Sequence, residues 1–100
     1  MQVSKEMLQI REELLERFSQ KRNLIDSSLT DEQLINNENY RECYLINSLL
    51  ITLFDDEVSY EAGEIFLKEH NYNIDSLFNN YILEYDSIAK NFIIKVKDNE

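Results

Sequence analysis

Few side chains in this 100-residue sequence are of the types that do chemistry. Its one cysteine, Cys43, and its one histidine, His70, are too few to build a Cys/His metal site. His70 has no serine or cysteine at a catalytic spacing, so we expect it to act as a cation at a helix C-terminus. The acidic run 55–57 lacks the central glycine of a calcium-binding loop. We therefore predict a protein that is not an enzyme, with no catalytic residue, metal, cofactor or small-molecule substrate.

The chain is strongly acidic, and its charge is unevenly spread. The formal net charge is −10, from 20 acidic and 10 basic residues. Residues 55–86 carry nine acids and a single base, Lys68. Such a charge repels nucleic acids and anionic lipids and attracts basic proteins, so we expect a protein partner, no nucleic acid and no membrane. The alternative is that the acidity serves only the solubility of a small protein.

The sequence also bears on where the protein is located. Its first turns are charged and amphipathic, without the apolar core of a secretory signal. The most apolar stretch, 43–54, is interrupted by Asn47, Ser48 and Thr52, which suits a buried helix better than a membrane span. A lone cysteine is typical of a reducing compartment. We expect the protein in the cytoplasm or the nucleus.

The spacing of apolar residues predicts an all-α fold, a small helical bundle. Zero prolines and one glycine leave too few turn residues for a β-sandwich or a barrel. The first helix carries an apolar stripe over residues 7–18, and the central helix spans 40–54. Polar residues suited to helix N-caps precede the apolar runs at Ser4, Thr30, Asn39, Ser59 and Asn73.

Two later helices complete the predicted bundle. The helix that follows Ser59 is expected to bury Ala62, Ile65, Phe66 and Leu67. Gly63 inside it indicates a close approach by another helix, since glycine otherwise costs about 1 kcal/mol there. The last helix runs from Asn73 to Asp86, with inward-facing Leu77, Phe78, Tyr81, Ile82 and Leu83. The alternation of apolar residues with lysines over 92–97 predicts a short strand or an extended arm.

Residues 49–85 carry a pattern of residue types found in one known superfamily. An aliphatic helix end at 65–67 is followed by a turn, and then by the aromatic Tyr72, the polar cap Asn73 and the aliphatic Ile74. A further helix with paired apolar positions comes next. With these residues the segment resembles the ubiquitin-associated-like superfamily, which includes the UBA and CUE domains.

The resemblance divides the chain into three segments: N-terminal helices at 1–44 that extend the bundle or bind a partner, a UBA-like three-helix module at 45–86, and a tail or short strand at 87–100. Tail residues 92–96 also resemble a SUMO-interacting motif, in which apolar residues are flanked by acids. Such a motif adds a strand to the sheet of its partner. The alternative is a strand that packs on the protein's own body.

The resemblance also implies a surface that binds ubiquitin or a ubiquitin-like protein. In the family, the loop after the first helix and the end of the third helix make this contact. The candidate binding residues, carried over with the acids beside them, are Leu53, Phe54, Asp55, Asp56, Ile82 and Leu83. Such a patch suits a partner with an apolar spot in a basic surround, as ubiquitin has. The alternative is that Leu53 and Ile82 belong to the core and the acids to a solvated face.

We thus expect a non-catalytic protein-binding adaptor, and two other functions stay open. The first is an acidic inhibitor or immunity-type protein that presents residues 55–86 to a basic enzyme as a phosphate mimic. The second is a small structural subunit whose stripe over residues 7–18 docks into a large complex.

Overall fold

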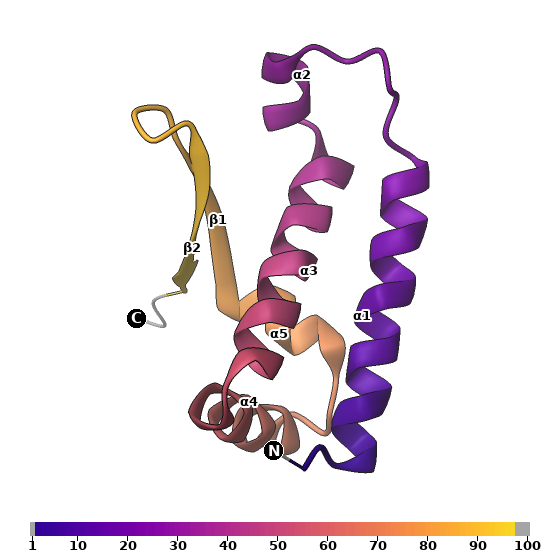
Figure 1. Ribbon diagram of the computed structural model, residues 1–100, viewed down its shortest axis with the longest axis vertical. Coiled ribbons are helices and arrows are strands. Elements are labelled where there is room, and N and C mark those ends of the chain that lie inside the picture. The colour runs from indigo at the N-terminus through magenta and orange to yellow at the C-terminus, as the bar shows by residue number, and fades with distance from the viewer. Residues whose placement is uncertain (1, 98–100) are drawn as a thin grey trace.

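The computed structural model describes residues 2–97, which form five helices followed by a β-hairpin (Figure 1). The helices, in chain order, are α1 (Lys5–Asn23), α2 (Asp31–Ile35), α3 (Glu38–Asp55), α4 (Glu57–Glu69) and α5 (Ile74–Asn80). The hairpin consists of the antiparallel strands β1 (Tyr81–Asp86) and β2 (Asn91–Val96). The predicted all-α class is therefore wrong, because a two-stranded sheet follows the helices.

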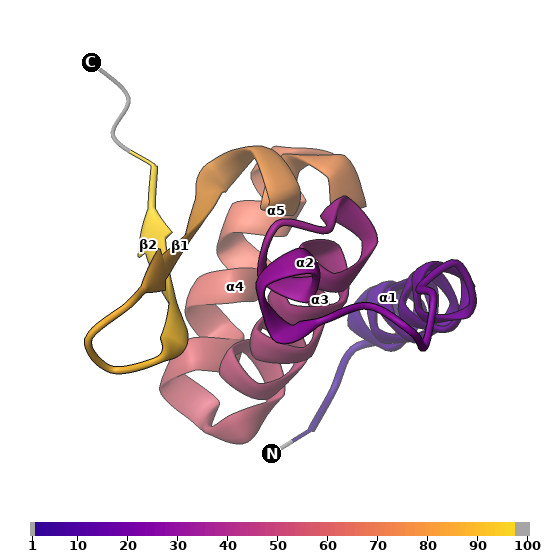
Figure 2. The same cartoon turned by 90° about the horizontal axis from the view of Figure 1, so that it is seen from above.

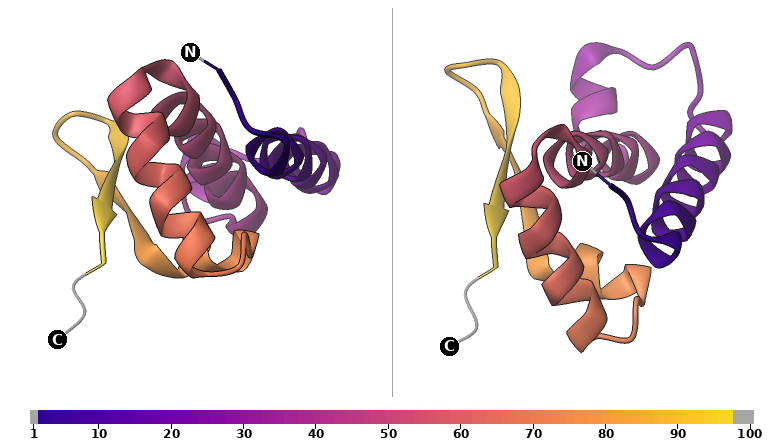
Figure 3. Two further views of the ribbon diagram at one scale, coloured as in Figure 1. Left: turned by 90° about the horizontal axis from the view of Figure 1, so that it is seen from below. Right: turned by 60° about the horizontal axis from the view of Figure 1, so that its bottom comes forward.

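Helix α3 lies at the centre of this arrangement. Figures 1 and 2 show α1 along one side of α3 and the hairpin along the other. Helix α4 crosses at the C-terminal end of α3, and both panels of Figure 3 show it between the hairpin and α1. The short α5 follows α4 and leads directly into β1. The hairpin is therefore attached to the helices at its open end, while its turn extends away from α5.

Residues 81–86 form a strand instead of the end of the last helix. The helix predicted to begin after Asn73 stops at Asn80, because the next six residues pair with β2. The apolar spacing in this segment fits a helix, but its aromatic and aliphatic residues also suit a strand. The pairing with β2 determines that it forms a strand. The three-helix module predicted at 45–86 is corrected accordingly: it holds most of α3, then α4, α5 and β1.

Short polar side chains begin each helix. Three N-caps predicted from the sequence are confirmed by the structure: Ser4, Thr30 and Asn73. The other two predicted caps are wrong by a few residues. Asn37 rather than Asn39 caps α3, and Asp56 rather than Ser59 caps α4. In each case the side chain accepts a hydrogen bond from the amide three residues later, as N-caps do.

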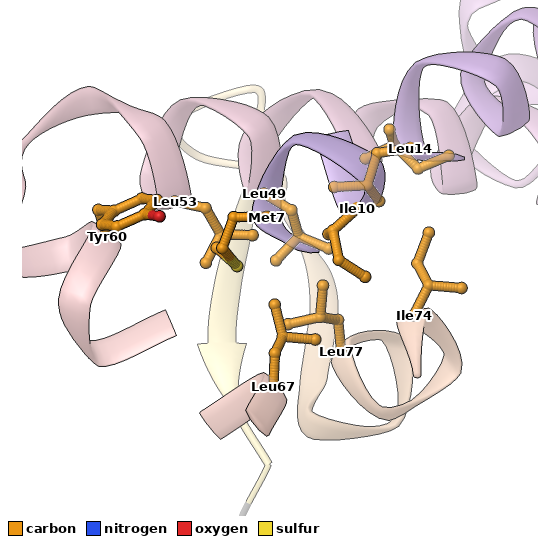
Figure 4. Packing of buried hydrophobic residues seen from close by; sticks show 10 residues of the cluster. Met7, Ile10, Leu14, Leu49, Leu53, Tyr60, Leu67, Ile74 and Leu77 are labelled. Atoms are coloured by element: carbon orange, nitrogen blue, oxygen red, sulfur yellow. The ribbon is translucent and has the colours of Figure 1, made fainter. Parts of the chain in front are cut away.

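One core joins α1, α3, α4 and α5, as Figure 4 shows from close by. Its buried members are Met7, Ile10, Leu14, Ile46, Leu49, Leu53, Tyr60, Leu67, Ile74 and Leu77. Leu8 and Leu15 of the predicted stripe over residues 7–18 are 46% exposed, whereas the three members from α1, which belong to the same stripe, are at most 2% exposed and pack on the protein's own helices. At about 25 cal/mol per Å² of apolar surface, each such side chain contributes roughly 2 kcal/mol. These α1 side chains are therefore not free for docking into a complex.

Helices α3 and α4 approach closely at Gly63, as the glycine predicts. A Cβ atom at this position would collide with Cδ2 of Leu53 on α3. Because glycine has no Cβ atom, the Leu53 side chain of α3 packs directly against the backbone of α4 at this position. This contact fixes which face of α4 is buried: Tyr60 and Leu67 point to the core and are 4% and 0% exposed.

The hairpin turns without glycine or proline. The Asp86 carboxylate accepts hydrogen bonds from the amides of Ile88 (2.9 Å) and Ala89 (3.2 Å), and these bonds shape the turn. Lys90 closes the turn in the left-handed conformation, with φ at 56°. The segment over 92–97, predicted to be a strand or an extended arm, contributes most of its residues to strand β2, which packs against α3. Residues 98–100 of the predicted tail lie outside the described residues.

Substituting Lys90 with glycine is expected to stabilise the protein by about 0.5 kcal/mol. A non-glycine residue in the left-handed region costs roughly 1–2 kcal/mol, which exceeds the extra chain entropy that a glycine loses on folding. Unfolding in urea measures the change. Ala89→Gly is the matched control, because Ala89 has no positive φ and its substitution is expected to destabilise by about 0.5–1 kcal/mol. Equal effects of the two substitutions would contradict the strain at Lys90.

Candidate functional site

The candidate binding residues of the loop after α3 divide between the core, a helix cap and the surface. Leu53 is 2% exposed and belongs to the core. Phe54 is half-buried, and its ring centroid lies 6.2 Å from that of Tyr60. The Asp56 carboxylate caps α4 and accepts a hydrogen bond of 2.7 Å from an amide of its first turn. Leu53, Phe54 and Asp56 thus make contacts within the fold, whereas Asp55 is exposed.

Ile82 and Leu83, the other two candidates, lie on β1 and point to opposite faces of the sheet. Ile82 pairs with Lys95 and is 39% exposed, whereas Leu83 pairs with Ile94 and is half-buried. Leu83 lines a hollow of about 510 Å³ between the helices and β1, and Leu53 lines a separate one of about 210 Å³. The structure therefore does not gather the two halves of the carried-over surface into one apolar patch.

Helix α4 presents to solvent an apolar stripe that includes two residues predicted to be buried, Ala62 and Ile65. Val58 and Ile65 are 78% and 61% exposed, and Ala62 between them is exposed as well. Residues at this spacing lie on one face of a helix. The predicted burial of Ala62 and Ile65 is wrong, because the contact at Gly63 turns the opposite face of α4 to the core.

Exposed acids surround this stripe: Asp55, Glu57, Glu61 and Glu69. We call the stripe of Val58, Ala62 and Ile65 together with these four acids the α4 surface. Three ion pairs occur among residues 2–97, and none of them involves an acid of the α4 surface. The α4 surface therefore offers apolar side chains beside acids that form no ion pair with the described bases, and Lys68 is the single base of α4.

The groups whose pKa values are shifted lie apart from one another. Burial raises the pKa of the Cys43 thiol on α3, and the neighbouring Glu42 adds to this rise. Partial burial, with nearby carboxylates, raises the pKa of Tyr72 in the turn before α5. Hydrogen bonds from Ser28 lower the pKa of Asp26 in the loop after α1. These groups come from three separate segments and do not form a nucleophile with a base beside it.

His70 forms the C-cap of α4, the position predicted from the sequence. Its Nδ1 lies 2.9 Å from the carbonyl oxygen of Phe66, and its ring stacks on the Phe66 ring at 4.3 Å. Within residues 2–97, no three His, Cys, Asp or Glu side chains gather as a metal ion would require. In the same part of the chain, no helix has the length and apolar character needed to cross a membrane.

Three comparisons with known proteins gave the same result for this chain. A scan against protein-family models, a search of curated proteins and a search of solved structures each found no match.

Proposed function

We propose that this chain is a non-catalytic protein-binding module whose α4 surface binds a folded partner. The observation that carries the proposal is the exposure of Val58 and Ile65 on a helix whose other face is buried. The matching partner has an apolar patch inside a ring of Lys and Arg side chains. A ubiquitin-like protein is the first candidate, because the resemblance of residues 49–85 points to this class of partner.

Apolar contact and charge have separate parts in this binding. Removing Val58, Ala62 and Ile65 from water supplies affinity, at about 25 cal/mol per Å² less the cost of association. The acidic rim speeds encounter with a positively charged partner and disfavours acidic proteins. Salt is therefore expected to weaken binding moderately. A phosphate-mimicking inhibitor depends on the acids alone, and its affinity would fall steeply with salt.

Ubiquitin is expected to shift the backbone amide NMR signals of residues 55–69 when it is added to the isotope-labelled chain. Ile65→Ser is expected to weaken binding at least roughly tenfold, because it removes most of an apolar side chain that the partner would cover. Ile88→Ser is the matched control, since Ile88 is 93% exposed in the hairpin turn and outside the α4 surface. Signals that stay in place throughout the titration, or equal effects of the two substitutions, would contradict the proposal.

A further inference from the structure

A pocket lined by aromatic rings lies at the turn end of the hairpin, apart from the α4 surface. Its volume is about 280 Å³, and residues of α2, of the first turns of α3 and of the hairpin line it. Figure 1 shows the hairpin turn rising beside α3 to the level of α2. Its lining includes the rings of Tyr40, Tyr44, Tyr85 and Phe92 and the charged side chains of Asp31 and Lys90. We call this site the aromatic pocket.

Phe92 is the most deeply buried ring of the aromatic pocket, and three tyrosines surround it. Phe92 is 8% exposed, whereas the tyrosines are half-buried. The ring centroids of Tyr40, Tyr44 and Tyr85 lie 6.1, 4.7 and 5.2 Å from its own. Their planes are inclined to it by 48°, 50° and 72°, so the rings do not form a flat stack. The Tyr44 hydroxyl donates to Oδ1 of Asn91 at 2.5 Å, which holds that ring in place.

The rings of the aromatic pocket favour a cation as its occupant. The face of an aromatic ring carries partial negative charge and attracts a cation within about 6 Å of its centre. Phe92 already has one such neighbour: the Arg41 guanidinium, which does not line the pocket, lies 5.2 Å from its centroid and opposes a second cation as a like charge. Of the two charged side chains that line the pocket, Asp31 favours a cation and Lys90 opposes it. The net charge of −10 also raises the local concentration of cations.

We propose that the aromatic pocket binds a trimethylammonium group. This group is charged but has no N–H donor, so it needs no hydrogen-bond acceptor, and its methyl groups pack against ring faces. A lysine ammonium is a strongly hydrated point charge that gains less from such walls. Choline and a trimethylated lysine side chain both carry the group. The site shares no residue with the α4 surface, so this proposal stands independently of the proposed function.

Choline is expected to bind the full chain roughly tenfold more tightly than its uncharged isostere 3,3-dimethyl-1-butanol. The ring and amide NMR signals of the residues lining the aromatic pocket report the binding of both compounds. A tighter complex with trimethyllysine amide than with choline would support a modified peptide as the source of the group, and the reverse order a free small molecule. Equal binding of choline and its isostere, or no binding of either trimethylammonium compound, would overturn the proposal.

Substitutions in the aromatic pocket locate the bound cation. Tyr85→Leu keeps an apolar side chain but removes one ring, and it is expected to weaken choline binding about threefold to tenfold. Tyr81→Leu, at the other end of β1 and outside the pocket, is the matched control and is expected to leave the affinity unchanged. Lys90→Gly is expected to strengthen binding, because it removes a like charge. Unchanged affinity in a folded Tyr85→Leu variant would overturn the assignment, and should that variant not fold, the comparison of choline with its isostere decides.

Discussion

Replacing Leu53 with alanine is expected to lower the free energy of unfolding by about 3 kcal/mol. Leu53 is 2% exposed, and its side chain fills the space where α3 meets Gly63 of α4. The truncation leaves a cavity that closes only in part, because the surrounding core is closely packed. For a domain of about 100 residues, this loss corresponds to a melting temperature lower by roughly 15 °C. Urea and thermal unfolding measure the two quantities.

Ile51→Ala is the matched control, two residues away on the same helix. Ile51 is 58% exposed, so its truncation is expected to change the stability by less than about 1 kcal/mol. Gly63→Ala gives a second test. It is expected to destabilise the wild type through the collision with Leu53, but to stabilise the Leu53→Ala variant, where the space is free and alanine is the better helix former. The same effect of Gly63→Ala in both backgrounds would contradict the close contact.

Features of the fold that depend on residues close together along the chain could be predicted from the sequence. The Thr30 hydroxyl and the Gln33 side chain form a capping box within four residues, so the pattern alone identifies the start of α2. Ser4 and Asn73 cap their helices for the same local reason. Gly63 also indicated its contact correctly, because an interior glycine costs helix stability unless another helix needs the space.

The hairpin could not be predicted in the same way, because its turn uses none of the usual turn residues. Asp86 replaces them with hydrogen bonds to two amides of the turn, and Lys90 adopts the left-handed conformation that glycine usually takes. The scarcity of glycine and proline in the composition therefore excluded large β-folds but not this small sheet. The apolar residues of β1 fit a helix as well as a strand, and only the pairing with β2 distinguishes the two.

The candidate site was missed for a related reason, the rotation of α4 about its axis. Apolar residues lie all around this helix, so periodicity does not determine which face is buried. The sequence pattern favoured the face with Ala62 and Ile65, and the structure buries Tyr60 instead, together with Leu67, whose predicted burial is confirmed. The spacing of Tyr60 and Leu67 about Gly63 was the available signal, since residues three and four apart lie on one face of a helix. Ile82 and Leu83 were expected on a helix, but they are neighbours on β1 and therefore point to opposite faces of the sheet.

Replacing Arg41 with methionine is expected to lower the free energy of unfolding by about 2–3 kcal/mol. Its Nη1 donates to the carbonyl of Ile35 at 3.1 Å, and its Nη2 donates to the carbonyl of Leu83 at 2.6 Å. One side chain of α3 thus joins the end of α2 to β1, and its guanidinium also lies over the Phe92 ring. Methionine keeps the apolar stem but leaves both carbonyls without this donor.

The bond to Leu83 also covers a strand edge. The Lys97 amide donates to the Asn80 carbonyl at 2.7 Å, so in the alternating ladder the even-numbered residues of β1 bond to β2. The carbonyl of Leu83 points to the opposite edge, where an uncovered strand would pair readily with another chain. Arg41 therefore holds the hairpin on the helices and protects this edge.

Arg41→Lys separates the charge from the fork geometry of the guanidinium. Lysine keeps the positive charge but has one nitrogen in place of the fork. Arg41→Lys is therefore expected to lower the free energy of unfolding by roughly half as much as Arg41→Met does. Amide hydrogen exchange locates the loss: the amides of β1 and β2 are expected to exchange faster in both variants, and those of the α3 core much less so. Arg11→Met, on the exposed face of α1, is the control and is expected to leave stability and exchange unchanged. Hairpin amides that exchange at the wild-type rate in Arg41→Met would show that the packing of Phe92 alone holds the hairpin on α3.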